Sequence, residues 1–199
     1  QYTNIANAAF FTVFYVPLVP ILLFFIYSIK VHWSIWPSIG LCIIGVYLLS
    51  DFSNSEIMIG DALVILCSLF WALHIIFAGK FMEKFNIPIF YAALQAALVF
   101  TLSIFFAAFL EEIVITKILL EYSSILYAGV LSGGIAFTLQ MFAQKNIEET
   151  PAAIIYSLEG VFATIAGWVI LSQILNINNI IGCILIPVSY THLRAHETV

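Results

Sequence analysis

One acidic residue stands in the middle of an apolar stretch that is long enough to cross a membrane. Glu159 lies within residues 151–174, PAAIIYSLEGVFATIAGWVILSQI, and about 20 apolar residues in a helix span the ~30 Å hydrocarbon core of a bilayer. A carboxylate at that depth costs about 2.5–3.5 kcal/mol, so such residues face a bundle interior or a watery cavity. Burial would favour the neutral acid, which could take up a proton when a substrate leaves. We therefore expect Glu159 to bind substrate or protons; the alternative is a structural residue bonded to a neighbouring helix.

Two aromatic residues and a histidine are the next candidates for substrate contact. Tyr156 precedes Glu159 by one helical turn and shares its face, where it could bind a polar group of a substrate or simply satisfy Glu159. His74 follows Trp71 by one turn in another apolar stretch. A histidine titrates near neutrality, and a tryptophan can hold a cation or a ring. The alternative for His74 is a core histidine bonded to a backbone carbonyl.

A further candidate for substrate contact is Gln140. It is a candidate because it shares a helical stripe with Gly133 and Phe137. The competing interpretation is that its amide joins two helices by a hydrogen bond, which contributes on average about 0.6 kcal/mol in membranes.

Four further residues could interrupt or bend a helix. Pro17 and Pro20 lie inside the first apolar stretch, and proline kinks or unwinds a membrane helix when neighbours or water satisfy the freed carbonyls. Gly133 and Gly134 allow close helix approach or a hinge. The prolines predict either a break beside a substrate cavity or a kink with no further role.

Composition places these residues in a membrane protein. The chain of 199 residues is 63% hydrophobic and 9% charged, against about 25% charged residues in a soluble domain. The net charge of −5 is spread between apolar runs and indicates no acidic or nucleic-acid partner.

The three cysteines, Cys42, Cys67 and Cys183, lie in apolar segments without CxxC spacing, so we expect neither a disulfide nor a metal site. No catalytic motif, nucleotide loop or ATPase signature is present, which predicts a non-enzyme without cofactor.

Six apolar spans and the stub of a seventh follow one another along the chain. They cover residues 8–29, 33–49, 62–79, 87–110, 123–142 and 151–174, with the stub at 180–186. Between them lie a polar loop at 51–61, a charged turn at 80–86 and an acidic loop at 111–121. The pattern predicts an all-α, polytopic transmembrane helix bundle.

The charged residues alternate between loops and predict the topology. The first, third and fifth loops contain Lys30, Lys80, Lys84 and Lys145, whereas the second and fourth contain Lys117 and six acids. The positive-inside rule then places the loops at Lys30, Lys80–Lys84 and Lys145 in the cytoplasm of a multi-pass plasma or inner membrane protein.

The first two spans resemble the last two in their spacing. Pro17 precedes Gly40 by 23 residues, and Gly160 precedes Gly182 by 22. Because the two copies enter the membrane from opposite sides, the pattern indicates an inverted repeat, a feature of many secondary transporters.

Several stretches resemble the EamA-domain proteins of the drug/metabolite transporter superfamily. GVLSGGIAFTLQMFAQKNIEETPAAIIYSLEGVFATIAGWVIL (129–171) is similar to the eighth and ninth helices of that family; NAAFFTVFYVPLVPILLFF and IGLCIIGVYLLS resemble helices four and five, and GDALVILCSLFWALHIIFAGKF resembles helix six. The resemblance implies a ten-helix transporter, with residues 1–50 ending the first repeat and 57–186 forming most of the second. Ser172, Gln173 and Asn176 replace the charged residues usual after the ninth helix.

Both ends of the chain suggest a fragment. The sequence begins at Gln1 without an initiator Met, and residues 187–199, PVSYTHLRAHETV, change abruptly from apolar to polar. The last segment resembles translated sequencing-adapter read-through, so we interpret it as a non-native tail that truncates the seventh span at Ile186. His192 and His196, four residues apart, lie in this tail, so we do not interpret them as metal ligands.

The sequence therefore predicts a gradient-driven membrane transporter that exports or exchanges a small polar metabolite such as an amino acid, with protons as a candidate coupling ion. One alternative is a multidrug or organic-cation efflux carrier in which Glu159 neutralises the ligand. An alternative of another class is a non-transporting scaffold or receptor-like subunit, in which Glu159 should pack against a fixed donor. Oligomeric state is left open.

Overall fold

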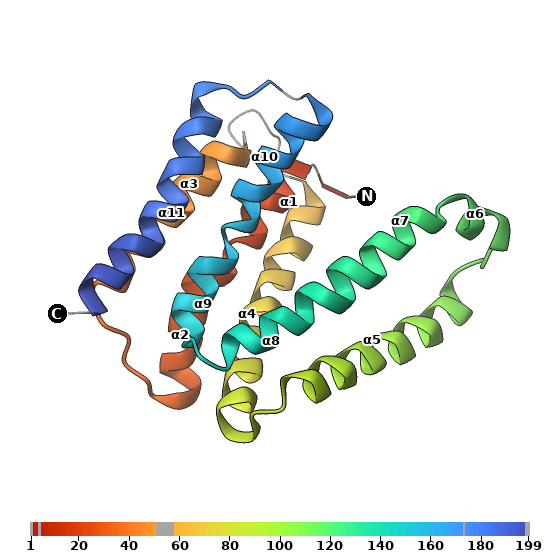
Figure 1. Cartoon of the computed structure of the whole chain (residues 1–199), viewed down its shortest axis with the longest axis horizontal. Helices are drawn as coiled ribbons and strands as arrows, with labels where there is room; N and C mark the ends of the chain where they lie inside the picture. The colour runs from red at the N-terminus through yellow and green to blue at the C-terminus, as the bar shows by residue number, and fades with distance from the viewer. Residues whose placement is uncertain (1, 4, 51–57, 173, 198–199) are drawn as a thin grey trace. The chain divides into compact units, whose positions relative to one another are not determined.

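A computed structural model shows the chain as a set of helices. It describes residues 2–3, 5–50, 58–172 and 174–197, and within these no strand is formed. The helices, labelled in Figure 1, are α1 (Ile5–Thr12), α2 (Tyr15–Tyr27), α3 (Ile35–Ser50), α4 (Ile59–Phe85), α5 (Pro88–Leu110), α6 (Ile115–Leu120), α7 (Tyr122–Leu126), the π-helix η2 (Tyr127–Ala136), α8 (Phe137–Gln144), α9 (Glu149–Tyr156), α10 (Glu159–Leu171) and α11 (Ile177–Glu197).

Five helical segments in the described part of the chain are long and apolar enough to cross a membrane. They are Asn7–Tyr27, Ile59–Phe85, Pro88–Leu110, Tyr122–Gln144 and Glu149–Ile170, and shorter apolar helices cover Ile35–Ser50 and Ile177–Leu193. The prediction of an all-α, polytopic bundle is confirmed. The second predicted span appears as one of the shorter helices, and the ten-helix arrangement stays a prediction.

Two expected connections are partly helical. The charged turn expected at 80–86 belongs to α4, in which Lys80 and Glu83 form an ion pair of 3.0 Å. Basic residues are compatible with the last turns of a helix because they face the negative end of its dipole. The acidic loop at 111–121 contains the short helix α6. Of the polar loop predicted at 51–61, residues 51–57 lie outside the described part of the chain.

The last helix extends beyond the expected end at Ile186. Helix α11 continues through Pro187 to Glu197, and Ser189 and Leu193 on its far half are buried. A proline removes one backbone donor, which a packed helix tolerates. The helix therefore does not end at Ile186, although its apolar part, Ile177–Leu193, is still shorter than the five segments that are long enough to cross a membrane. That residues 187–199 are not native stays a prediction.

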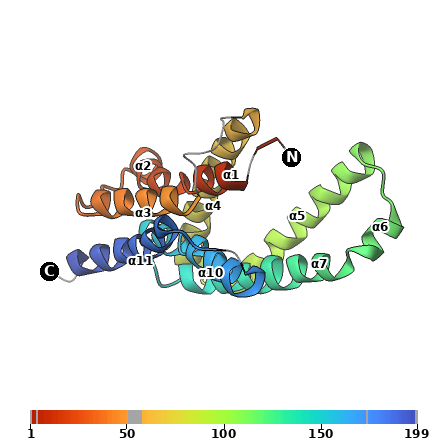
Figure 2. The ribbon, with the colours of Figure 1, turned by 90° about the horizontal axis from the view of Figure 1, so that it is seen from above.

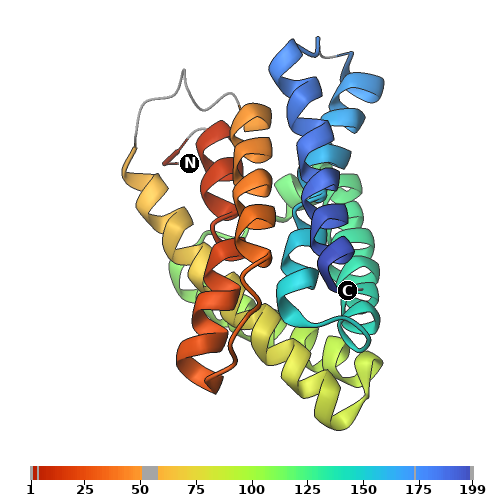
Figure 3. The same ribbon diagram turned by 90° about the vertical axis from the view of Figure 1, so that its left-hand side faces the viewer.

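The chain divides into two compact units, and the larger contains Gln1–Phe77 and Glu148–Val199. Within it α2 packs on α9, α3 packs on α11, and α10 contacts both α3 and α11. Figure 3 shows α11 lying along α9 and α10. The core of this unit is apolar and includes Val16, Val19, Ile39, Val46, Ile75 and Ile154.

Glycines let α3 and α11 cross closely. A Cβ atom on Gly182 would lie 2.6 Å from the carbonyl oxygen of Gly45, and one on Gly45 would lie 2.6 Å from Cγ1 of Ile186. Membrane helices commonly approach through such small residues. The crossing fixes the end of the first predicted repeat against the end of the second.

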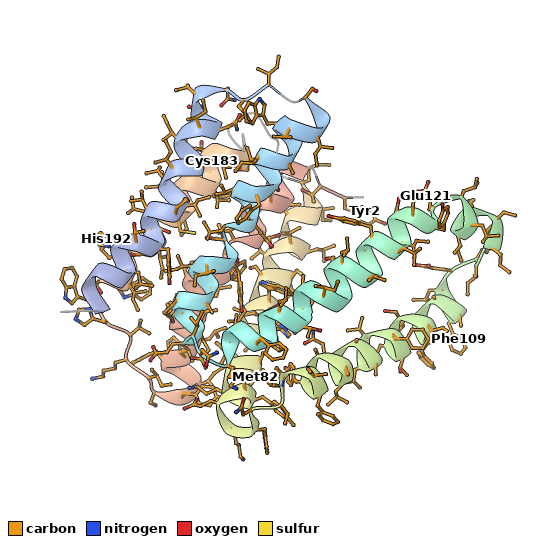
Figure 4. The ribbon with its side chains drawn as sticks, viewed as in Figure 1. Tyr2, Met82, Phe109, Glu121, Cys183 and His192 are labelled. Carbon is orange, nitrogen blue, oxygen red and sulfur yellow. The ribbon has the colours of Figure 1, made fainter. Side chains whose placement is uncertain are left out.

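The smaller unit, Ala78–Ile147, is a pair of long helical arms. One arm is α5 and the other is the continuous run α7–η2–α8; Figure 2 shows the two arms joined through α6. They meet where α5 packs on α8, and near that end Met82 and Met141 are buried with Ala78. Helix α5 has no buried residue, and Phe109, labelled in Figure 4, is 74% exposed. An apolar surface of this kind suits lipid contact.

Candidate substrate site

The first span is interrupted one turn before Pro17, where the proline removes a helical hydrogen bond. Helix α1 ends at Thr12 and α2 begins at Tyr15. The ring of Pro17 cannot donate to the carbonyl of Val13 and would clash with it in a regular helix. The N–H of Val16 donates to that carbonyl instead, at 2.9 Å. Pro20 lies within α2, which continues past it to Tyr27.

The span that contains Glu159 is also interrupted, and Glu159 is the first residue after the break. Helix α9 ends at Tyr156 and α10 begins at Glu159. The hydroxyl of Ser157 donates to the carbonyl oxygen of Ile154 at 2.6 Å, and the N–H of Leu158 donates to Ile155 at 3.0 Å. Serine hydroxyls compete with the helical hydrogen bonds in this way.

A buried thiol ties this second break to a neighbouring helix. Cys42 of α3 donates to the hydroxyl of Ser157, with 3.1 Å between Sγ and Oγ. Both residues are buried. The contact holds α3 against Ser157, the first residue of the two-residue turn that precedes Glu159.

Tyr15 connects most of the candidate residues. Its ring, fully buried, meets the Trp71 ring edge-on with centroids 6.5 Å apart, and Trp71 stacks on His74 at 5.3 Å. Tyr156 packs against the same apolar core as Tyr15 and Trp71. Three of the five predicted substrate contacts, Trp71, His74 and Tyr156, are therefore linked through this core of the larger unit.

Two hydroxyl groups in this cluster are buried without a hydrogen bond. Within the described residues, the phenolic oxygens of Tyr15 and Tyr156 have no partner. Tyrosine hydroxyls buried in proteins usually find one. Such unsatisfied groups are typical of a position where a ligand or a water molecule supplies the missing hydrogen bond.

Glu159 differs from expectation in its burial. Its side chain is exposed in this chain, and the described residues provide it with no hydrogen-bond donor or ion-pair partner. Glu159 begins α10 beside Phe162 and Ala163, which are also exposed. This exposure disagrees with a bundle interior but not with a watery cavity, so the role of Glu159 in binding a substrate or protons stays a prediction.

The remaining predicted residues lie in the smaller unit. Gln140 is half-buried in α8, and Gly133 and Gly134 lie within the π-helix η2. The side-chain nitrogen of Gln140 has no hydrogen-bond partner in the described part of the chain. π-helical turns often occur at functional sites, so a hinge at these glycines stays a hypothesis.

Sequence reasoning missed Tyr15, Cys42 and Ser157. Tyr15 could have been noticed as a polar aromatic two residues before Pro17, whereas nothing in the sequence pairs Cys42 with Ser157, 115 residues away. The three cysteines are free thiols. No group of three or more metal-ligating side chains occurs among the residues that the structure describes.

Comparison with known proteins places this arrangement in a family. The profile of the EamA-like transporter family matches residues 58–192, which include the break at Ser157, Glu159 and most of α11. The chain belongs to the EamA-like transporter family. Membership agrees with the resemblance noted in the sequence and favours a transporter over an enzyme. The match also extends into the polar segment after Pro187.

A relative is similar along almost the whole chain. An "uncharacterized transporter" of Archaeoglobus fulgidus is 33% identical over 189 residues, which cover 94% of this chain and 59% of that protein. The chain thus spans about three fifths of the length of this relative. Together with the five helical segments that, in the described part of the chain, are long and apolar enough to cross a membrane, the family shows a multi-pass membrane protein.

Proposed function

We propose that this chain is part of a secondary transporter that exports or exchanges a small polar metabolite such as an amino acid. The observation that carries the proposal is the meeting of two interrupted helices at one polar cluster. Tyr15 follows the break in the first span, and Tyr156 and Glu159 flank the break in the other. Discontinuous helices form the substrate sites of many carriers because their ends offer free backbone groups and a place to bend.

The state of Glu159 favours a carrier over a scaffold. A scaffold would hold the carboxylate against a fixed donor, yet within the described residues no donor contacts it. An acid at this depth is costly in lipid and requires water or a polar partner. A substrate that arrives and leaves, or an exchanging proton, meets that requirement.

Aromatic rings in the core of the larger unit support the second candidate function. Tyr15 and Trp71 lie edge to face in the same cluster, and aromatic rings attract cations. An efflux carrier for organic cations would use Glu159 to neutralise the ligand. The two carriers differ in whether the substrate also carries an acidic group.

The energy source and topology belong to the same proposal. We propose that a gradient drives transport, with protons as the candidate coupling ion, and that the loops at Lys30, Lys80–Lys84 and Lys145 face the cytoplasm of the plasma or inner membrane. The two interrupted spans, within 1–50 and 57–186, would be corresponding helices of inverted repeats. Tyr156, His74 and Trp71 would contribute to the site, with hinges at Pro17 and Pro20. In the smaller unit, a substrate contact by Gln140 and a hinge at Gly133 and Gly134 stay separate predictions.

The test replaces the carboxylate by its neutral isostere. In proteoliposomes containing the whole protein, Glu159→Gln should abolish solute flux or remove its dependence on pH, because the amide can neither bind a proton nor carry charge. Glu111→Gln is the matched control, since Glu111 is exposed at the end of α5. pH-dependent flux that survives unchanged in well-inserted Glu159→Gln would refute the role of this residue.

A further inference from the structure

We propose that Asp61 is a positioning residue for transport, because its hydrogen bonds hold the carrier closed at the end where α1 and α4 begin. The contact, here named the α1–α4 clasp, is made by Tyr2, Thr3, Asn7, Met58, Gly60 and Asp61. This inference rests on the proposed transport function, since it assigns the clasp to one of the two ends that a carrier opens in turn. Under the proposed topology this end faces away from the cytoplasm.

The carboxylate of Asp61 is buried, with 2% of the residue exposed, and it accepts three hydrogen bonds. The hydroxyl of Thr3 donates to Oδ1, and Nδ2 of Asn7 donates to Oδ2 at 2.9 Å. The N–H of Met58 also donates to Oδ2, at 2.7 Å. Two of the three donors lie 58 and 54 positions away from Asp61, so the carboxylate joins two distant parts of the chain.

A helix cap alone does not account for this arrangement. An acid in the first turn of a helix is stabilised by the backbone donors there and by the helix dipole, and Met58 provides such a donor. A carboxylate that only capped α4 could remain in water, whereas burial of a charge is costly unless hydrogen bonds compensate for it. Asp61 is covered by the segment that contains Thr3 and Asn7, so its charge holds that segment in place.

The backbones of the two segments also meet. The N–H of Gly60 donates to the carbonyl oxygen of Tyr2 at 3.0 Å. A Cβ atom on Gly60 would lie 2.5 Å from the carbonyl carbon of Tyr2, so a larger residue would force the segments apart. Figure 1 shows the N-terminal segment reaching the first turn of α4. The two segments are in direct contact, and no solute can pass between them at this point.

The chemistry of the clasp allows it to open. The donors to Asp61 are a hydroxyl, an amide and a backbone N–H, and among the described residues no ion pair includes this acid. Water molecules can replace neutral donors around a carboxylate at little cost in enthalpy. The clasp is therefore stable while it is dry, and it can separate when water enters this end of the carrier.

The clasp fixes one half of the interrupted first span. Helix α1 is tied to α4 by Asn7 and packs on α3, whereas α2 packs on α9. The turn between Thr12 and Tyr15 separates these two sets of contacts. Release of the clasp would therefore let α1 move away from α4 while α2 stays on α9. Asp61 thus acts through the first span and not by contact with a solute.

Two buried serines at opposite ends of α3 can report which end of the carrier is open. Phe10 of α1 meets Tyr47 of α3, with ring centroids 5.7 Å apart, and Asn7 and Ser50 lie one turn further toward the clasp. Ser34 lies just before α3, at its other end. Ser50 and Ser34 are only 8% and 3% exposed, so a cysteine at either position should react with a thiol reagent only when its end opens.

The experiment measures the labelling rates of Ser50→Cys and Ser34→Cys in the whole protein in nanodiscs, with trimethylammonioethyl methanethiosulfonate as the reagent. All variants contain Cys67→Ala, which removes an exposed thiol, and labelling of this parent is subtracted. Asp61→Asn keeps the shape of the side chain but accepts weaker hydrogen bonds. It should raise the rate at Ser50→Cys by about tenfold, the size of one hydrogen bond to a charged group. It should lower the rate at Ser34→Cys, because a carrier that opens at one end closes at the other.

Thr3 provides a milder variant and its matched control. Thr3→Val removes one donor and leaves the carboxylate of Asp61 in place, so it should change both labelling rates in the same directions as Asp61→Asn, by smaller factors. Thr3→Ser retains the hydroxyl and should give the wild-type rates. This pair decides the question if Asp61→Asn does not fold.

Only opposite changes at the two reporters support the inference. A rise at both reporters would indicate a general loss of stability, and a rise at Ser50→Cys alone would indicate loosening of one end. Unchanged rates would indicate a clasp that does not control opening. Each of these three results would overturn the inference. Labelling requires no solute, so its outcome is independent of the flux measured with Glu159→Gln, which tests the proposed function.

Discussion

Substitution of Gly182 by alanine tests the closest helix crossing in the larger unit. The added Cβ would lie 2.6 Å from the carbonyl oxygen of Gly45 and 2.9 Å from Cγ of Leu49. The first distance is shorter than ordinary contact, at 3.4 Å, by about 0.8 Å, and the obstacle is backbone that no rotamer change can move. Helices α3 and α11 would have to separate.

The expected magnitude follows from two opposing effects. Overpacking of a well-packed contact costs about 1–3 kcal/mol, whereas replacing glycine by alanine within a helix gains up to about 1 kcal/mol. Gly40→Ala on α3 is the matched control, because nothing lies within 4 Å of a Cβ at that position. It should show the gain without the clash.

The assay is thermal unfolding of the purified protein in detergent. About 1 kcal/mol shifts Tm by roughly 2–4 °C for a chain of 150–250 residues, so Gly182→Ala should melt at least about 2 °C below Gly40→Ala. Gly45→Ala disturbs the same crossing, so its combination with Gly182→Ala should be less than additive. Equal melting of Gly182→Ala and Gly40→Ala would refute the close approach of α3 and α11.

Three further predictions concern local contacts. Cys42→Ala should lower the rate of solute flux by the whole protein while changing its melting temperature little, because the thiol holds the turn before Glu159. Cys67→Ala, at an exposed thiol, should change neither quantity. Equal flux in the two variants would contradict this role of Cys42. Asp61→Asn should cost about 1–3 kcal/mol in thermal unfolding. Thr3 donates to one carboxylate oxygen, Asn7 and the N–H of Met58 (at 2.7 Å) donate to the other, and hydrogen bonds to a neutral amide are weaker than those to a carboxylate. An unchanged Tm would contradict it. Pro17→Ala should raise helix content in circular dichroism, because Val13 regains a regular helical partner.

The candidate site shows how far the sequence could lead. Glu159, Tyr156, Trp71 and His74 could be proposed from the sequence because each is a polar or aromatic residue inside an apolar span, where lipid makes such residues costly. The break near Pro17 followed from the covalent geometry of proline, which acts within one turn. Tyr15 could not be assigned the same way, because its importance depends on a ring contact with Trp71, far along the chain.

The exposure of Glu159 and the course of α11 also depended on tertiary packing. The carboxylate was expected inside the bundle from its depth in the span, but depth does not specify which side of the helix faces the neighbours. The polar string after Pro187 was expected to end the helix, yet contacts with α3, including Ser38 near His192 at 3.2 Å, accompany its continuation.

The amino-acid sequence by itself determined that this chain lies in a membrane, which segments are helical and which residues are chemically out of place there, because hydrophobicity and proline act locally. Only the tertiary structure decided that the two interrupted spans pack together through α2 and α9, and that Cys42 supports the second break. Cys42 and Ser157 are 115 positions apart, so only the packing of α3 on the end of α9 brings them together.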